Sequence, residues 1–592
     1  SQGSDLFDNG VYPLKTSVGE FRVPAIFAER ERMDALANVL DEFVESGVGK
    51  DAFLHRLNVA ARLPAKEMAE AKTQLARLFE QLKELHAQGL NGVWARIIKN
   101  AFAPLFIEPC DYIVGNPPWV NWENLPDEYR NSLIPLYEDF YGLFPHRGLA
   151  ARHGSAKIDI SSLMTYVAID RYLKPGGKLG FVLPQNLFKT SAGQGFRRFL
   201  LPQGKPFGPL VVEDMVELQP FEGATNRTAV AVFFKGKPVR YPVSYQYWKK
   251  RGTGRGSAIG FDTPYEEVTI EKITFRTWHA EPVDRKDLTS SWITARRSAL
   301  QALHNVLGQS AYIAHAGSFT GGANGIYWVE IVGERPGGLC IVANVTEGAK
   351  NKVERTQAAV EKEILYPLLR GRDIGRWSAE PSIWIVCPQD PNDPKHGMPT
   401  EALAKQCPKA NAYLKRFEKA LSSRPAYEKY LKRSGEPFYA LYDIKKYTFS
   451  PWKVVWREQA ATFTAAVVGP QEKRPVVPDH KLMIVAVDSR TEAHYLCAAL
   501  NSAPSCLAVA AYAIQIQMDT HILENVGVPQ FSKNNKTHIR LAELSENAHK
   551  AAAKGDTGEV SKIEEEIDRA AARLWGLKDE DLAEIKRSLE EA

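Results

Sequence analysis

The sequence predicts a multidomain protein in which part of an α/β sheet with a helical insertion precedes an α+β domain and a C-terminal helical hairpin. Three observations predict this. The chain has 592 residues, too many for one compact core. Short apolar runs alternate with amphipathic helices between residues 106 and 250, as in an α/β unit with a largely parallel sheet. Long runs of strong helix formers lie before residue 101 and after residue 541.

The composition is that of an ordinary globular protein, with one asymmetry of charge. Hydrophobic residues make up 44% of the chain and charged residues 24%. The net charge is +5, but residues 541–592 contain 14 acidic and 8 basic side chains, so the preceding part of the chain is basic. A basic body with an acidic end is compatible with a polyanionic partner.

The cysteines and the N-terminal sequence indicate a reducing cytoplasm. Six cysteines are scattered singly, without a Cys-x-x-Cys pair, which argues against a disulfide framework and against a zinc site. No window approaches the roughly 18 to 20 uncharged apolar residues of a membrane span. The start, "SQGSDLFDNGVYPLK", lacks the apolar centre of a signal peptide. We therefore expect a cytoplasmic protein with no metal site and no membrane contact.

The first 250 residues divide into two predicted parts. Residues 1–105 form a linker and a helical insertion, because apolar residues recur at three- and four-residue spacing from about residue 28 to residue 101. Residues 106–250 form a sheet with helices. The expected strands are a short buried strand at 111–117 and further strands at 178–184, 211–218 and 228–234, with a helix at 161–173.

The second half mixes both kinds of structure. We place a domain boundary near residue 250 and predict an α+β domain over 251–540 and a helical segment over 541–592. In the α+β domain, "LCIVAN", "SIWIVC", "WKVVWRE" and "HKLMIVAV" predict strands, and residues 353–369 and 492–502 predict helices. Residues 563–591 predict a helical hairpin with acidic faces.

The stretch Asn116-Pro117-Pro118-Trp119 suggests a nucleobase site, because it follows an apolar strand at the end where α/β sheets bind ligands. The amine of adenine is a poor nucleophile, since its lone pair is delocalised into the ring. Two hydrogen-bond acceptors, the Asn116 side chain and the Pro117 carbonyl, would draw the nitrogen toward tetrahedral geometry. Trp119 offers a stacking surface to a base that has left the duplex. The alternative is an ordinary rigid turn.

A strand followed by Asn-Pro-Pro-aromatic resembles the catalytic motif of amino-methyltransferases, in particular adenine-N6 DNA methyltransferases. The resemblance implies a partial Rossmann-like methyltransferase sheet, hydrogen bonds from the target amine to Asn116 and Pro117, and stacking of Trp119 on the base. "IDISSLMTYVAIDRYLKPGGKLGFVLPQNLF" and "FEGATNRTAVAVFF" resemble the next motifs in order. Asp159 would then lie near the amino-acid end of the cofactor, and Phe221 against the base. Alternatively, Asp159 begins a helix and Phe221 belongs to the core.

The second half resembles the TaqI-like target-recognition domain of fused restriction–modification enzymes, in "EKEILYPLLRGRDIGRW", "HYLCAALNS" and "HILENVGVPQF". The resemblance implies a double-stranded DNA partner, with other restriction or defence subunits as further candidates. Arg370, Arg372 and Arg376 are candidates for phosphate contacts, although exposed arginines are more often simply solvated.

The resemblance also implies S-adenosyl-L-methionine as cofactor, but its Gly-rich binding turn is not found. "KKRGTGRGS" has the glycines without a preceding buried strand or a following helix. We therefore expect this chain to be the C-terminal part of a longer protein, with the main cofactor motif upstream. No acidic nuclease cluster is visible in the sequence.

Two other functions remain open on sequence grounds. One is a DNA-recognition module without catalysis, in which the methyltransferase half is only a scaffold. The other is methylation of a protein glutamine or an RNA base, since an amide nitrogen presents the same electronic problem. The large C-terminal domain argues against that second alternative.

Overall fold

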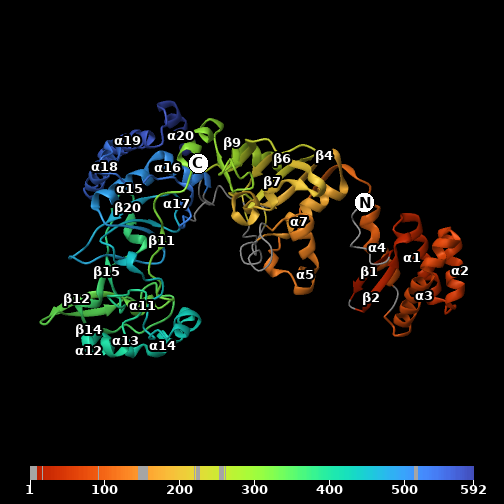
Figure 1. The fold of residues 1–592 in the computed structure, drawn as a ribbon, viewed down its shortest axis with the longest axis horizontal. Helices are drawn as coiled ribbons and strands as arrows, with labels where there is room; N and C mark the ends of the chain where they lie inside the picture. Colours follow the sequence, from red (N-terminus) through yellow and green to blue (C-terminus); the bar gives the residue numbers. More distant parts are fainter. Residues whose placement is uncertain are drawn as a thin grey trace. The chain divides into compact units, whose positions relative to one another are not determined.

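The computed structural model describes residues 10–591 except 17, 91–92, 145–157, 219–220, 222–226, 253–258, 261 and 513–517 (Figure 1). The chain forms two compact units: Ser1–Ile113 with Val167–Gly177, and Val114–Tyr166 with Lys178–Ala592. Within the described ranges, no helix is both long and apolar enough to cross a membrane.

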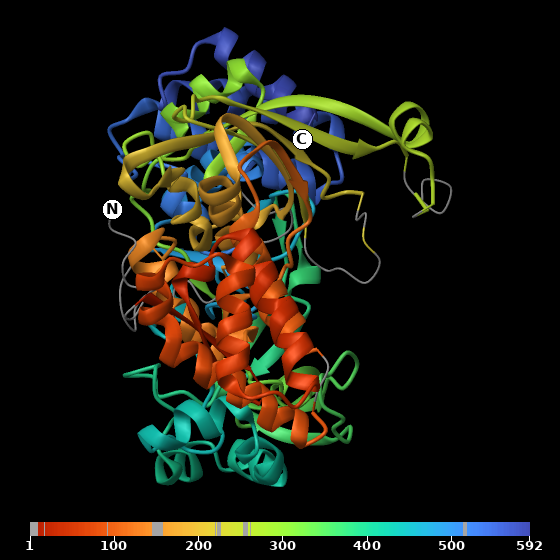
Figure 2. The same ribbon diagram turned by 90° about the vertical axis from the view of Figure 1, so that its right-hand side faces the viewer.

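The first unit is a group of helices joined to a β-hairpin. Its main elements are β1 (Val11–Thr16), β2 (Gly19–Pro24), α1 (Arg30–Glu45), α2 (Lys50–Ala61), α3 (Ala65–Ala87) and α4 (Trp94–Phe102). The helices pack side by side (Figure 2), and the rings of Phe53 and Phe79 stack at 4.4 Å in their core. The prediction of helices from residue 28 to residue 101 is confirmed. The linker predicted before these helices contains the antiparallel hairpin of β1 and β2, which such short strands do not reveal by periodicity.

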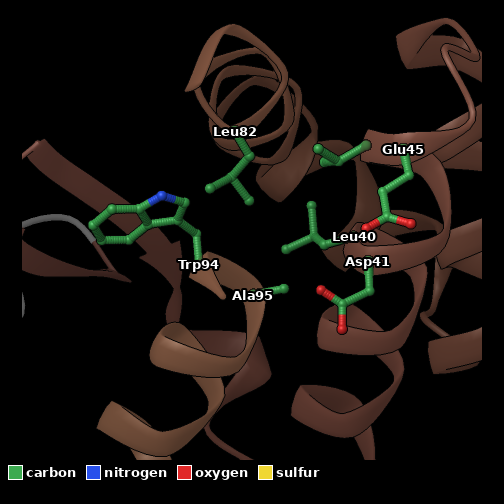
Figure 3. A pocket seen from close by; sticks show the side chains of 7 residues that line it. Leu40, Asp41, Glu45, Leu82, Trp94 and Ala95 are labelled. Carbon is green, nitrogen blue, oxygen red and sulfur yellow. The ribbon is translucent and has the colours of Figure 1, made fainter. Parts of the chain in front are cut away.

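A small recess lies among these helices (Figure 3). Leu40, Leu82 and Trp94 form its apolar wall, and Asp41 and Glu45 its acidic rim. Its volume is about 20 Å³, room for one water molecule and too little for a substrate. We therefore assign it no function.

An eight-stranded sheet, in the order β10-β9-β8-β6-β7-β4-β3 with β5 paired to β6, lies mainly in the second unit, while residues 110–113 of β3 and 173–177 of β4 are counted with the first. Its strands are β3 (Cys110–Gly115), β4 (Leu173–Pro184), β5 (Leu200–Leu201), β6 (Lys205–Asp214), β7 (Thr228–Lys235), β8 (Val243–Lys250), β9 (Ile273–Pro282) and β10 (Trp292–Ala295). The described helices beside it are α5 (Asp127–Pro135), α7 (Ile160–Val167) and α8 (Asn186–Lys189). The boundary expected near residue 250 thus lies inside this sheet, between β8 and β9.

The expectation of a largely parallel sheet is wrong. Strands β6 and β8 pair in parallel, but β7 pairs antiparallel with both β4 and β6, and β9 pairs antiparallel with β8 and β10. Strands β4 and β6 do run in the same direction, as the crossover between them predicts. Strand β7 lies between β4 and β6, however, so these two strands do not pair with each other. Each of them pairs with β7 in antiparallel orientation instead.

The expected burial of the strand before Asn116 is also wrong. Strand β3 is the last strand of the sheet, and Tyr112 is 73% and Val114 85% exposed. Apolar composition alone predicts a buried strand, but side chains are buried only where other elements pack on the faces of the sheet, and an edge strand in addition has a hydrogen-bonded neighbour on one side only. Strand β3 therefore leaves apolar side chains and one row of backbone groups uncovered in this structure.

Two further sheets follow in the rest of the chain. A four-stranded sheet contains β11 (His315–Ala316), β22 (Leu482–Val487), β19 (Trp452–Arg457) and β20 (Ala465–Val468). A six-stranded sheet contains β14 (Gln357–Glu361), β13 (Leu339–Asn344), β12 (Trp328–Arg335), β18 (Ile383–Val386), β15 (Leu365–Leu369) and β21 (Val477–Pro478). A short hairpin is formed by β16 (Ile374–Gly375) and β17 (Ser378–Ala379). The strands named from sequence are confirmed, but the helix predicted over 353–369 is wrong, because β14 and β15 occupy it.

The helices of this region fall into two groups around two hydrophobic cores. The first group is α10 (Arg297–Val306), α15 (Arg490–Asn501), α16 (Ala503–Tyr512), α17 (Ile522–Asn525), α18 (Lys536–Ala553), α19 (Thr557–Leu574) and α20 (Asp579–Glu591). The second group is α11 (Asn324–Tyr327), α12 (Thr400–Gln406), α13 (Pro408–Arg416) and α14 (Glu418–Ser422). The short helix α9 (Tyr265–Glu267) lies between β8 and β9. The predicted hairpin is confirmed as α19 and α20, which share a core with the four-stranded sheet.

A buried histidine, His494, and a partly buried one, His549, predict acid sensitivity of this core. His549 Nε2 accepts a hydrogen bond from the Val467 N–H at 3.0 Å, and His494 Nδ1 lies 3.1 Å from Ser545 Oγ. Burial lowers the pKa of His494 to about 3 and that of His549 to about 4. In the unfolded chain histidine has a pKa of about 6.5. Protonation therefore favours unfolding, so this stability is present above about pH 6.5 and lost as the pH falls toward 4.

The check is the free energy of unfolding in urea, measured from pH 8 to pH 4. We expect His549→Gln to flatten the loss of stability on the acid side. The matched control is His55→Gln, at an exposed histidine of the first unit, which should leave the profile unchanged. An equally steep acid loss in His549→Gln would contradict this explanation.

Candidate functional site

The segment Asn116-Pro117-Pro118-Trp119 follows directly on the end of β3 and has no regular secondary structure. Pro117 is buried, whereas Asn116 is exposed and its side chain makes no hydrogen bond to another described residue. The Trp119 Nε1–H donates to the Val182 carbonyl of β4 at 3.3 Å. One end of the segment is thus attached to the sheet, and the amide of Asn116 is available to a ligand.

Trp119 and Phe221 contact each other. Their ring centroids are 5.7 Å apart and the planes meet at 87°, an edge-to-face arrangement. Phe221 is 38% exposed, and the residues on both sides of it lie outside the described ranges. The structure brings together the two aromatic residues expected at the base. A base held between them would require parallel rings, so their role as base-stacking partners stays a prediction.

Asp159 lies alongside the chain that follows the motif. It forms an antiparallel bridge with Asn121, and the Ile160 N–H donates to the Val120 carbonyl at 3.0 Å. Its Oδ1 accepts the Ser161 N–H at 2.8 Å, the hydrogen bond of a residue that caps helix α7. Asp159 therefore begins helix α7, as the alternative interpretation of this residue predicts. Its contact with a cofactor stays a prediction.

The surroundings of Asp159 are buried and contain uncompensated polar atoms. Asp159 is 1% exposed, and burial raises the pKa of its carboxyl group, an effect that the Ser161 N–H partly offsets. Among the described residues, the Tyr137 hydroxyl and Ser161 Oγ are buried and have no well-aligned hydrogen-bond partner. Such atoms are rare in native proteins and suit a polar ligand. Trp122, by contrast, is 5% exposed and packs on Tyr137 and Phe144, so it belongs to the core.

A buried polar network at the ends of β4 and β6 was missed by sequence analysis. Asp214 Oδ2 accepts hydrogen bonds from Gln185 Nε2 at 2.6 Å and from the Tyr245 hydroxyl. The Gln185 N–H donates to the Arg227 carbonyl at 2.8 Å. Burial is the main reason why the pKa of Asp214 is raised. Gln185 directly follows a predicted strand, just as Asn116 does. This position at a strand end was the one sequence feature that could have indicated a role for Gln185.

Lys189 connects this region to the C-terminal helices. It is 6% exposed, and its Nζ donates to Thr294 Oγ1 at 2.6 Å and to the Ala511 carbonyl of α16 at 2.9 Å. Burial lowers the pKa of Lys189 to about 8, although Asp214 opposes the shift.

The three candidate DNA-contacting arginines differ in their surroundings. Arg370 is 8% exposed and donates to Asp373 and to Ser382, and Arg376 is paired with Glu564 of α19. These two guanidinium groups have internal partners, so the phosphate-contact prediction does not fit them in this structure. Arg372 is exposed, and for it the prediction stays open.

Residues 65–205 match the family of Eco57I restriction-modification methylases. The matched segment contains Asn116, Trp119, Asp159 and Gln185. The match agrees with the resemblance to restriction–modification methyltransferases drawn from the sequence.

Two curated proteins of Haemophilus influenzae are similar to part of the chain. They are the type II methyltransferases M.HincII and M.HindII, each 27% identical over 153 residues. The alignment with M.HincII covers 24% of this chain and 26% of that protein. The matched part of the chain thus spans about a quarter of the length of these relatives.

Solved structures resemble the chain over a larger share of its length. The type IIL restriction-modification enzyme MmeI in complex with DNA covers 89% of this chain and 65% of its own, with 11% identity and a TM-score of 0.48. The DrdV–DNA complex covers 88% of this chain and 56% of its own, with 12% identity and a TM-score of 0.35.

Tyr245→Phe tests the buried network around Asp214. The substitution removes one of the two side-chain donors to a buried carboxylate, so we expect a loss of about 1–3 kcal/mol in the free energy of unfolding. Urea titration followed by circular dichroism measures it. Tyr265→Phe, at a tyrosine that is 65% exposed, is the control and should cost little. Equal stability of both variants would show that the Tyr245 hydrogen bond is not needed.

Proposed function

We propose that this chain supplies the catalytic motif and the DNA-recognition region of a site-specific adenine-N6 DNA methyltransferase of a restriction–modification or phage-defence system. The observation behind the proposal is the exposed amide of Asn116, which makes no hydrogen bond to another described residue, at the end of a sheet strand inside the segment that matches the methylase family. A DNA-recognition module without catalysis would not need that amide to be free.

In the proposed reaction the chain positions the target amine. The Asn116 side-chain oxygen and the Pro117 carbonyl accept hydrogen bonds from its two N–H groups, which localises the lone pair on the nitrogen. Consecutive prolines restrict the backbone, so the carbonyl is held in place before the base arrives. Trp119, fixed by its hydrogen bond to Val182, provides an apolar surface beside the base. The reaction needs no charged residue at the amine, because the methyl donor is already activated.

The described residues fit one end of the expected cofactor. S-adenosyl-L-methionine supplies an electrophilic methyl group when bound. The buried carboxylate of Asp159, with the buried Tyr137 hydroxyl and Ser161 Oγ beside it, suits the charged amino-acid end of that molecule. A site for its adenosine part is not identified among the described residues, and we derive no geometry for it.

Asn116→Ala should abolish methyl transfer and leave DNA binding intact, because it removes an acceptor that acts only on the reacting amine. We expect the rate to fall by about 10³-fold or more. The measurement is incorporation of labelled methyl groups by the protein expressed from its complete gene, followed by mass spectrometry of the nucleosides. Asn121→Ala, five residues downstream, is the matched control. Labelled N4-methylcytosine in place of N6-methyladenine would contradict the adenine assignment.

Calorimetric titration of S-adenosyl-L-methionine into residues 1–592 tests the cofactor part of the proposal. We expect no detectable binding, because the described residues offer only the Asp159 end of a site. Micromolar binding that Asp159→Asn weakens would instead mean that these residues contain a complete cofactor site. Asparagine still caps a helix, so this variant should keep the melting temperature of the unaltered chain.

A further inference from the structure

A row of aromatic side chains lies where three loops of the C-terminal region meet. His480 and Phe319 have ring centroids 4.9 Å apart, Phe319 and Tyr442 6.4 Å, and Tyr442 and Tyr430 5.3 Å with nearly parallel planes. All four rings are partly exposed, and Tyr430 is 47% exposed. We call these four residues the aromatic row. Aromatic side chains in contact with each other are usual in cores, but a partly exposed series of them suggests a binding surface.

The segments next to the aromatic row are basic on balance: residues 428–446 contain five basic side chains and three acidic ones, Glu428, Glu436 and Asp443. Five exposed cations come from the segments next to Tyr430 and Tyr442: Lys429, Lys432, Arg433, Lys445 and Lys446. None of the five forms an ion pair with another described residue. In the C-terminal helices, by contrast, Arg540 and Lys586 each contact two carboxylates. The cations beside the row are thus available to an external anion.

The backbone beneath the aromatic row is held in place by hydrogen bonds. Phe319 and Tyr442 exchange two backbone hydrogen bonds, at 3.0 and 3.1 Å, and the Ser318 N–H donates to the Pro478 carbonyl at 2.8 Å. These bonds join the loops that contain three of the four rings. The loops therefore keep their relative positions without a ligand.

A buried arginine fixes the same loops from below. Arg424 is 3% exposed, and its guanidinium donates to the carbonyls of Thr320, Phe438 and Ala440 at 2.7 to 3.0 Å. A buried cation must be fully hydrogen-bonded to be tolerated. Here it binds carbonyl groups on both sides of the loop contact, next to Phe319 in one loop and Tyr442 in the other. The surface is therefore pre-organised, as a recognition site requires.

We propose that the aromatic row and its five cations form a surface that binds double-stranded DNA. The inference rests on the proposed function and adds where the duplex is contacted. The lysines and Arg433 would contact phosphates, which position the duplex, and the tyrosine hydroxyls and the His480 ring would contact groove edges. His480 is oriented for this by the buried Asp479, whose Oδ1 lies 2.8 Å from its Nδ1.

The first test is the salt dependence of duplex binding by the full chain, measured by fluorescence anisotropy. Each phosphate contact that is lost lowers the slope of log K against log salt by about 0.9. We expect the triple variant Lys429→Gln, Lys432→Gln, Arg433→Gln to lower the slope by about 2 to 3. The control variant Lys536→Gln, Lys550→Gln, Lys554→Gln removes the same charge from exposed lysines of α18 and its end. It should leave the slope unchanged.

The second test separates the aromatic row from its charge. Tyr430→Ala should weaken duplex binding about fivefold to tenfold with the salt slope unchanged, because it removes a contact without removing a cation. Tyr430 is well exposed, so the variant should fold, which its circular dichroism spectrum checks. Normal affinity in Tyr430→Ala would overturn the part of the proposal that concerns the row.

The outcomes distinguish this inference from the proposed function. If the unaltered chain binds duplex DNA and the triple and control variants have the same slope, the duplex is contacted elsewhere and only this inference fails. If the unaltered chain binds no duplex, both fail. Tighter binding of a single strand than of a duplex of the same sequence would overturn the assignment to double-stranded DNA.

Discussion

The insertion of β7 between β4 and β6 determines the architecture at the ends of these two strands. Its antiparallel register places Thr228 opposite Pro184 and Ala229 opposite Asp214, so β7 begins where the two flanking strands end. Gln185 and Asp214 meet at this point and form their buried hydrogen bond. A parallel neighbour in the same place would end at that edge rather than start there. Val182 of β4, whose carbonyl accepts the hydrogen bond of Trp119, lies near this same edge of the sheet. The buried hydrogen bond between Gln185 and Asp214 therefore lies close to the strand end to which Trp119 is attached.

The exposed position of β3 gives the motif its accessibility. Because β3 is the edge strand, the chain that follows it is not covered by a further described strand, and the amide of Asn116 makes no hydrogen bond to another residue that the structure describes. The exposed Tyr112 and Val114 are the cost of this arrangement, since natural proteins usually protect apolar edges. The two prolines have a second effect here, because they lack N–H groups and cannot extend the unpaired edge beyond Gly115.

The sequence predicted what local patterns determine and failed where distant partners decide. Most strands and the helices of the first unit followed from periodicity, whereas the roles of Asn116 and Asp159 rest on motifs and stay predictions. Strand order did not, because nothing local to 228–234 says that β7 enters between two earlier strands. Residues 353–369 have helix-forming composition, yet their backbone pairs with β13 and β18. The ion pair of Arg376 with Glu564 joins residues nearly two hundred positions apart, so its internal role could not be inferred from its own segment.

Lys189 shows how the region behind the motif is joined to the C-terminal helices. A buried ammonium group loses its hydration, and the lowered pKa of about 8 records that cost. Its two hydrogen bonds, to Thr294 and Ala511, together with the nearby carboxylate of Asp214, offset part of it. An apolar side chain would avoid the cost but could pack in several positions, whereas an ammonium group must reach particular acceptors. The contribution of Lys189 is therefore mainly geometric: it fixes the end of β4 relative to β10 and α16, and a misplaced contact there would leave a buried charge unpaired.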